Sequence, residues 1–154
     1  MRPFSRLAVS LLVLSFASSA LAVSPDVGAI SPAGFQLGTE VEARFSGARL
    51  ADAQELLFYS PGIEVVELKA ENDSTVKAKL KFGPQCRLGI HAVRLRSATG
   101  ISNLRTFTVG PLPEVPEQEP NNEFAAPQAV PFGCTVSGVV QNEDVDHFVI
   151  EAKK

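Results

Sequence analysis

Residues 76–82 read Val76-Lys77-Ala78-Lys79-Leu80-Lys81-Phe82, a strict alternation of apolar and charged side chains. Successive side chains of a strand point to opposite faces of a sheet, so this alternation has the period of a strand and not of a helix. The segment predicts a strand with its apolar side in a core and its three lysines in water.

The same period continues on both sides of this segment. Residues 40–45 alternate glutamate and arginine with Val41, Ala43 and Phe45, and further strands are expected at 55–59, 63–68, 91–96 and 103–109. Ser60-Pro61-Gly62 and Thr99-Gly100 are typical turns between them. Several short strands without a helical window predict an all-β fold, an immunoglobulin-like sandwich. Tyr59 lies within an apolar run and is expected in its core, and His91 is expected at the end of a strand.

Charge and proline content divide the chain. Residues 23–109 carry nine acidic and ten basic side chains, whereas residues 110–154 carry eight acidic and two basic ones. The change falls in a segment with several prolines at 110–120, and prolines fix φ and remove amide donors. We therefore expect a semi-extended linker at 110–118 between a first module at 23–109 and a second at 119–154.

The N-terminus has the pattern of a signal peptide. Arg2 and Arg6 precede an apolar run at 7–16, and small residues surround an Ala-Leu-Ala sequence that ends at Ala22. The run is shorter than the roughly 20 apolar residues of a membrane-spanning helix. We expect cleavage between Ala22 and Val23. The mature chain would be exported, with a secreted, periplasmic or cell-surface location and no membrane segment.

The first module resembles an IPT/TIG-type immunoglobulin-like domain over residues 25–109. The resemblance rests on Ile30-Ser31-Pro32-Ala33-Gly34, Gly38-Thr39-Glu40-Val41 and Phe45-Ser46-Gly47, and on Gly89-Ile90-His91-Ala92-Val93-Arg94, Thr99-Gly100-Ile101-Ser102-Asn103 and Phe107-Thr108-Val109 near its end. The glycines in these motifs are expected to serve turns, and none is expected to cradle a phosphate.

The second module resembles the opening of a bacterial pre-peptidase C-terminal domain, a jelly-roll-like β-sandwich of secreted proteins. The resemblance rests on residues 117–123 (Glu-Gln-Glu-Pro-Asn-Asn-Glu), Ala125-Ala126, Gly138-Val139-Val140 and Asp144-Val145-Asp146-His147-Phe148. The pairing of both modules with a signal peptide resembles large secreted proteins of planctomycete-type bacteria. Because a further turn and strand would be expected after residue 154, the second sandwich is predicted to be incomplete, as in a fragment.

This second resemblance implies a calcium site. In the related collagen-binding domains, an acidic segment before the first core strand and a later aspartate pair chelate calcium. The matching residues are Glu117, Glu119, Asn121, Asn122, Asp144 and Asp146, with Glu143 as a substitute for Asp144. The residues themselves leave open a solvated acidic linker followed by a turn whose aspartates cap their own backbone. Asp144 and Asp146 are expected on one side of a strand that also carries Phe148 and Ile150.

The sequence does not indicate catalysis. It contains two histidines, His91 and His147, in different modules, and no metalloprotease helix, nucleophile elbow or phosphate loop. The net charge of −3 argues against nucleic acid as the main partner. Asn72-Asp73-Ser74 has the form of a glycosylation site, but a hairpin turn is the better interpretation. Cys86, in a loop, and Cys134, in a strand of the other module, are not expected to form a disulfide with each other.

Two functions stay open at this stage. The first is a binding or scaffolding module that engages an extracellular or cell-surface protein or polymer. The second is the non-catalytic N-terminal part of a larger secreted hydrolase of the peptidase type, whose catalytic domain is absent from this sequence. Fold resemblance by itself does not name a ligand.

Overall fold

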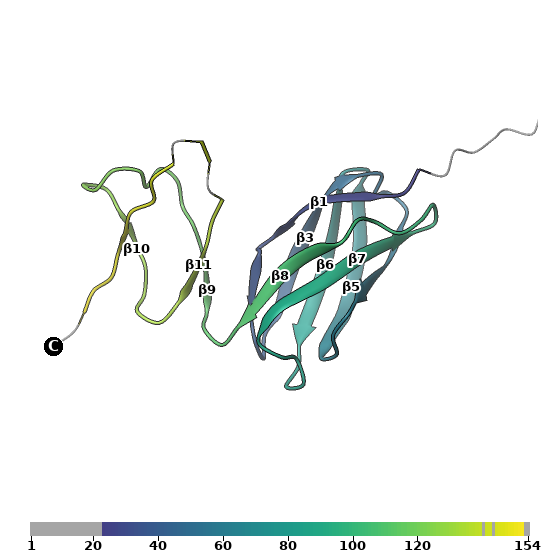
Figure 1. Cartoon of the computed structure of the whole chain (residues 1–154), viewed down its shortest axis with the longest axis horizontal. Helices are drawn as coiled ribbons and strands as arrows, with labels where there is room; N and C mark the ends of the chain where they lie inside the picture. The colour runs from purple at the N-terminus through teal and green to yellow at the C-terminus, as the bar shows by residue number, and fades with distance from the viewer. Residues whose placement is uncertain (1–22, 140, 143, 153–154) are drawn as a thin grey trace, which may run out of the picture.

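The computed structural model describes residues 23–139, 141–142 and 144–152, and the described chain is all-β, as predicted. Figure 1 shows two layers of long strands followed by a smaller, more open module. No helix within the described residues has the length and apolar character needed to cross a membrane. The predicted signal peptide, including Ala22, lies outside the described residues, and Val23 is exposed.

The first sheet is antiparallel throughout, with the strand order β1-β3-β6-β5. Its strands are β1 (Asp26–Ser31), β3 (Glu40–Ala48), β6 (Thr75–Phe82) and β5 (Ile63–Asn72). The alternating segment at 76–82 is the central strand β6, and its four apolar side chains are all buried. On the opposite face Lys79 Nζ lies 2.7 Å from a Glu40 carboxylate oxygen, and Lys77 reaches Glu42 at 3.4 Å and Glu71 at 3.0 Å. The expectation of a solvated, charged strand face is therefore confirmed.

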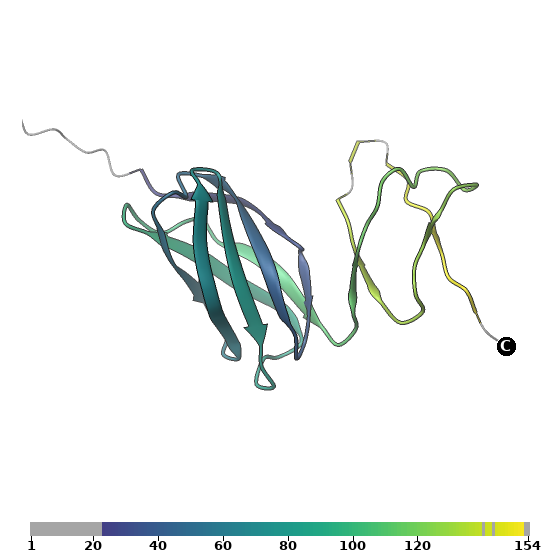
Figure 2. The same cartoon turned by 180° about the vertical axis from the view of Figure 1, so that it is seen from behind.

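The second sheet has the order β2-β8-β7-β4. Its strands are β2 (Gly34–Gln36), β8 (Arg105–Gly110), β7 (Gly89–Ser97) and β4 (Ala53–Phe58). β2 runs parallel to β8, and the other two pairs are antiparallel. β1 and β2 follow each other in sequence but belong to different sheets, so residues 26–36 connect the two layers (Figures 1 and 2).

The core lies between the two sheets and is built around aromatic side chains from both. Phe35 of β2 stacks on Phe82 of β6, with 4.8 Å between the ring centroids. Phe35 and Phe82 also contact Phe107 of β8 edge-on, at 5.3 and 6.3 Å. Such pairs add to the apolar burial that stabilises a sandwich. The contacts join strands that lie far apart in the sequence.

Local chemistry fixes two of the turns. Asn72 Oδ1 accepts hydrogen bonds from the Ser74 amide and hydroxyl, both at 2.8 Å, so Asn72-Asp73-Ser74 forms the predicted hairpin turn between β5 and β6. Gly62, before β5, has a φ of +89°, and a Cβ there would lie 2.2 Å from the Cys86 amide nitrogen. Only glycine fits this close approach.

Tyr59 is not in the core as expected, because its side chain is 62% exposed. Leu56 is buried and Phe58 contacts Phe107 edge-on at 6.0 Å, so Tyr59 faces outward one position later. The run Leu56-Leu57-Phe58-Tyr59 is apolar throughout and therefore gives no sign of which positions face the core. Packing against β8 decides the phase of the alternation.

His91 does not close the end of a strand but lies in the core, within β7 and 1% exposed. Its ring stacks on Phe107 with 5.6 Å between centroids, and Nε2 lies 2.8 Å from the Arg87 carbonyl oxygen and 3.8 Å from Cys86 Sγ. Burial raises the pKa of the Cys86 thiol, although Arg87 partly offsets this. Both Cys86 and Cys134 are free cysteines.

The second module contains two short parallel strand pairs. β9 (Glu114–Pro116) pairs with β11 (Thr135–Ser137), and β10 (Gln128–Ala129) pairs with β12 (Phe148–Val149). β9 lies inside the segment that the sequence predicts as a linker. Its pairing is long-range and follows no local period, so the sequence pattern could not reveal it. Cys134 lies just before β11 and not within a strand.

The strand expected around Asp144 and Asp146 is shorter than predicted, because β12 comprises only Phe148–Val149. Several large apolar side chains in this module are exposed. They are Phe124, Phe132, Val139, Val145, Phe148, Val149 and Ile150. An open apolar groove of about 1070 Å³ runs between the β10 and β12 segments, with Phe132 and Ile150 in its lining.

Candidate metal centre

The candidate site lies where the two strand pairs of the second module meet. Glu117 directly follows β9, and its amide donates to the Ser137 carbonyl at 2.9 Å, which extends the β9–β11 pairing. The side chain of Gln128, at the start of β10, accepts from the Gln118 amide at 2.8 Å and donates to the Pro116 carbonyl at 3.0 Å. These bonds fix the acidic segment that begins at Glu117 against β10.

The second half of the site is brought in by β12. The amide of Gln128 donates to the His147 carbonyl at 2.9 Å, and the His147 amide donates to the Asn121 carbonyl at 3.1 Å. Asp146, next to His147 in the chain, is thereby placed beside the acidic segment. Residues separated by 25 or more positions along the chain therefore meet through backbone hydrogen bonds.

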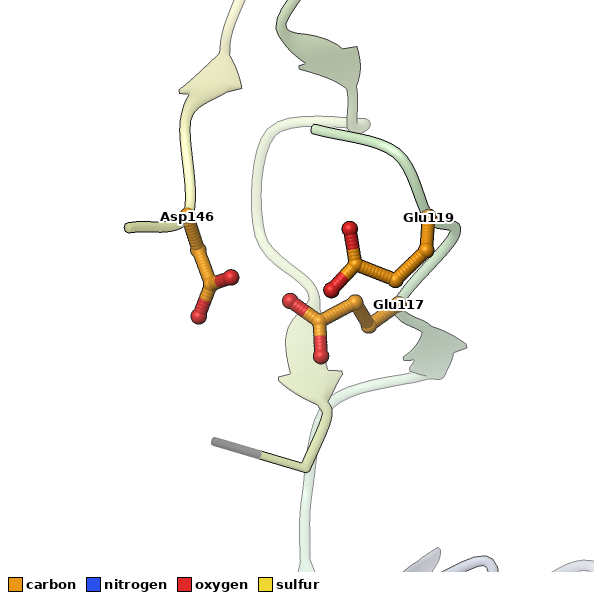
Figure 3. A group of neighbouring side chains, drawn as sticks. All are labelled: Glu117, Glu119 and Asp146. Atoms are coloured by element: carbon orange, nitrogen blue, oxygen red, sulfur yellow. The ribbon is translucent and has the colours of Figure 1, made fainter. Parts of the chain in front are cut away.

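Glu117, Glu119 and Asp146 converge in this arrangement. Each offers a carboxylate oxygen, and the three oxygens lie within 4.8 Å of one another. Figure 3 shows the three carboxylates directed toward a common space, with Asp146 coming from the opposite side to the two glutamates. Glu117 is further fixed because its Oε2 accepts from the Val139 amide at 3.0 Å.

Asn121 lies under this cluster and is 1% exposed. Its side-chain amide donates to Glu117 Oε1 at 3.1 Å, and its backbone amide donates to Glu119 Oε2 at 3.0 Å. Within the described part of the chain, Asn121 Oδ1 and Asp146 Oδ1 are buried oxygens that accept no hydrogen bond. Buried oxygens of this kind normally have a partner, and these two lie beside the acidic cluster, where they are suited to coordinate a cation.

The electrostatics of the cluster are unfavourable without a compensating charge. Burial raises the pKa of Asp146, and the negative charges of Glu117 and Asp144 raise it further. Glu119 acts in the same direction. Either a proton on Asp146 or a bound cation would relieve this repulsion.

Not all of the predicted ligands belong to the cluster. Asn122 is exposed and makes no hydrogen bond in the described chain. Asp144 Oδ2 accepts a hydrogen bond from the Gln141 amide at 2.9 Å, so Asp144 caps its own turn. This is the alternative to calcium binding that the sequence left open for the aspartates. Glu143 lies outside the described residues. The structure thus brings together Glu117, Glu119, Asn121 and Asp146.

Sequence reasoning missed the residues that hold the cluster in place. Gln128 and the backbone amide of Val139 contact the acidic segment from ten or more positions away. A lone glutamine in a polar segment carries no motif, and a backbone amide has no sequence signal at all. Only the strand pairing shows these roles.

No protein-family model matches this chain, and no curated protein matches it in sequence. The resemblances to an IPT/TIG-type domain and to a pre-peptidase C-terminal domain therefore stay predictions.

Proposed function

We propose that this protein is an exported, non-catalytic binding or scaffolding protein whose second module is stabilised by calcium. The observation that carries the proposal is the convergence of Glu117, Glu119 and Asp146 over the buried side chain of Asn121. Three carboxylates held close together repel one another unless a positive charge compensates them.

The donor set suits a hard cation. Calcium takes six to eight oxygen ligands from carboxylates, amide carbonyls, backbone carbonyls and water, in a flexible geometry. The two buried oxygens without a hydrogen bond, Asn121 Oδ1 and Asp146 Oδ1, are of the required kind. The carboxylates of Glu117 and Glu119 would supply the remaining protein ligands, and water would complete the shell. Magnesium is less suited, because it demands near-ideal octahedral geometry.

The proposal of a binding function and not a catalytic one rests on where the reactive side chains lie. His91 is enclosed in the sandwich core, where it stacks on Phe107. His147 contacts the exposed Phe124 edge-on, with 6.0 Å between ring centroids. Within the described chain, no ring nitrogen of His91 or His147 forms a hydrogen bond with a serine. The arrangement of a serine triad therefore has no support there.

Calcium titration of the mature chain, residues 23–154, tests the metal site. We expect calcium to bind with a dissociation constant in the micromolar to millimolar range and to protect the second module from proteolysis. The double variant Glu119→Gln, Asp146→Asn removes two ligand charges and should abolish both effects. The variant Glu151→Gln is the control, because it removes an exposed acidic charge of the same module outside the cluster.

The result that would overturn the calcium proposal is no binding heat together with identical proteolysis in calcium and in chelator. Equal weakening by the test and control variants would also overturn it, because it would indicate non-specific attraction to an acidic surface. Export has its own test, since mass spectrometry of the exported protein should find Val23 at the N-terminus. Recovery of an intact Met1 outside the cytoplasm would contradict the expected cleavage.

A further inference from the structure

The two outer faces of the sandwich differ in chemistry. The outer face of the β1-β3-β6-β5 sheet carries ion pairs between neighbouring strands, such as Lys79 with Glu40 and Lys77 with Glu71. A hydrogen bond from Lys79 lowers the pKa of Glu40, so both groups stay charged and paired over a wide pH range. Such a face is already satisfied by its own charges and by water.

The opposite face belongs to β8, β7 and β4, and we call it the Tyr59 face. Its members alternate along their strands with buried side chains such as Val93 and Phe107, so they point away from the core. They are Glu55, Leu57, Ile90, Ala92, Arg94, Arg96, Thr106 and Thr108 within the strands, and Tyr59 directly after β4. Glu55 is the one acidic member, and it is paired with Arg96 at 2.8 Å.

Tyr59 and Arg94 form a fixed pair on this face. Arg94 Nε donates to the Tyr59 hydroxyl at 2.9 Å, and Arg94 Nη1 donates to the Ser102 carbonyl at 2.6 Å. The Tyr59 amide bonds to the Ala92 carbonyl, so Ile90 is a diagonal neighbour of Tyr59, and both side chains are more than 60% exposed. Tyrosine and arginine are enriched at the centres of protein interfaces, and fixing them before binding lowers the entropic cost.

A complementary surface exists on the second module of the same protein. Glu123 and Phe124 are adjacent and exposed, and Phe124 is 85% exposed. They lie within residues 110–154, which carry eight acidic and two basic side chains, against nine and ten in residues 23–109. In Figure 1 the strands β7 and β8 lie toward the viewer, and the segment between β9 and β10 runs across the second module, beyond one end of the sandwich. One copy therefore does not place this segment on its own Tyr59 face.

We propose that the Tyr59 face binds the Glu123–Phe124 segment of a second copy of this chain. The Glu123 carboxylate would accept hydrogen bonds from the remaining donors of Arg94, and the Phe124 ring would cover Tyr59 and Ile90. Because the two contacting surfaces are different, the contact is head-to-tail and adds copies into a ring or an open chain. This inference rests on the proposed scaffolding function and names its partner as the protein itself.

Sedimentation velocity of the mature chain over a wide concentration range, in low and in physiological salt, tests this proposal. We expect the mean mass to rise with concentration, and to rise less at higher salt because the charged contact is screened. Arg94→Glu and Glu123→Lys should each weaken self-association about tenfold or more. Lys81→Glu is the matched control, because it makes the same charge change at an exposed position on the opposite face.

Mixing the two single variants gives the sharpest result. The Arg94→Glu copy keeps an intact Glu123–Phe124 segment, and the Glu123→Lys copy keeps an intact Tyr59 face, so the mixture should associate although neither variant does so alone. A protein that stays monomeric at every concentration would overturn the proposal, and so would a mixture that does not associate. The proposal would also fail if Lys81→Glu weakened self-association as much as Arg94→Glu does. Protection from proteolysis by calcium is measured on the same samples to keep the two proposals separate. If a monomeric protein is still protected by calcium, only the self-association proposal is wrong.

Discussion

The sandwich and the second module are stabilised by different interactions. The sandwich buries a continuous cluster of side chains, in which Phe35, Phe45 and Phe82 are each 1% exposed. Among the described residues of the second module, Val130 is the one buried apolar side chain, while Phe132 is 86% exposed. Hydrogen bonds hold this module together instead, such as the one that the Asn121 side-chain amide donates to Glu117.

This difference shows what each region depends on. Burial of apolar area stabilises the sandwich in any ordinary solvent. Two-stranded sheets without a packed face are marginal in water, and a cluster of like charges weakens them further. The second module should therefore respond to calcium, pH and proteases under conditions that leave the sandwich unchanged.

The largest expected effect is the loss of the whole second module to proteolysis in the presence of a chelator. Cleavage should trim the mature chain to a stable product that ends shortly after β8, near residue 110, because backbone with few buried contacts opens readily. Mass spectrometry of the product gives the boundary. A resistant product that still contains Ala152 in chelator would show that the second module is stable by itself.

Next in size is the loss of a core aromatic. Phe35→Ala removes contacts with both Phe82 and Phe107 and should lower the free energy of unfolding of the sandwich by about 3–5 kcal/mol. Phe132→Ala deletes the same side chain from an exposed position and should stay within about 0.5 kcal/mol. Urea unfolding followed by circular dichroism measures both. Comparable losses would mean that the second module has a core of its own.

A smaller effect concerns pH and the second module alone. Because the folded pKa of Asp146 is raised, the folded module holds this proton more tightly than the unfolded chain does. Stability without calcium should therefore be greatest below the ordinary pKa of aspartate and fall as pH rises through the folded pKa. Urea titrations followed by the NMR signals of Val130 and Val149 would show the decline.

Two further measurements check this assignment. Asp146→Asn should remove the decline, because the amide does not titrate. Calcium should reverse the trend, since protons compete with the ion for the same carboxylate and stabilisation by calcium then grows with pH. A decline that persists in Asp146→Asn would assign it to another group.

The smallest effect is expected on the charged face of the sandwich. Lys79→Ala breaks the ion pair with Glu40, but both side chains are exposed and screened by solvent. The melting temperature of the sandwich should change little at physiological salt. A large drop would indicate that this face is not simply solvated, and would weaken its contrast with the Tyr59 face.

The strands of the sandwich could be predicted where one face is charged and the other apolar. The alternation at 76–82 predicts β6 with its buried side, and the polar residues at 72–74 predict the turn before it. The strands β1 and β2 carry no such alternation, and the apolar run before Tyr59 hides which side faces inward. At these positions the contacts with distant strands decide the structure.

Within the candidate site, the types of the ligands were visible in the sequence, but their grouping was not. Asp144 and Asp146 are equivalent by spacing, yet one caps a turn and the other joins Glu117 and Glu119. The parallel pairing of β10 with β12 makes this choice, because it sets where the chain before Phe148 crosses the acidic segment. A local pattern contains no information on such a pairing.

The sequence by itself therefore determined the all-β class, the charge contrast between the modules and the set of candidate oxygen ligands. The first two follow from side-chain period and composition, which are local properties, and the ligand set follows from the resemblance of the second module to a pre-peptidase C-terminal domain. The tertiary structure decided that Tyr59 faces solvent beside Arg94, that His91 lies in the core and that Asn121 is buried under the acidic cluster. Each of these depends on strand pairing and packing between residues far apart in the chain, where long-range contacts override local preference.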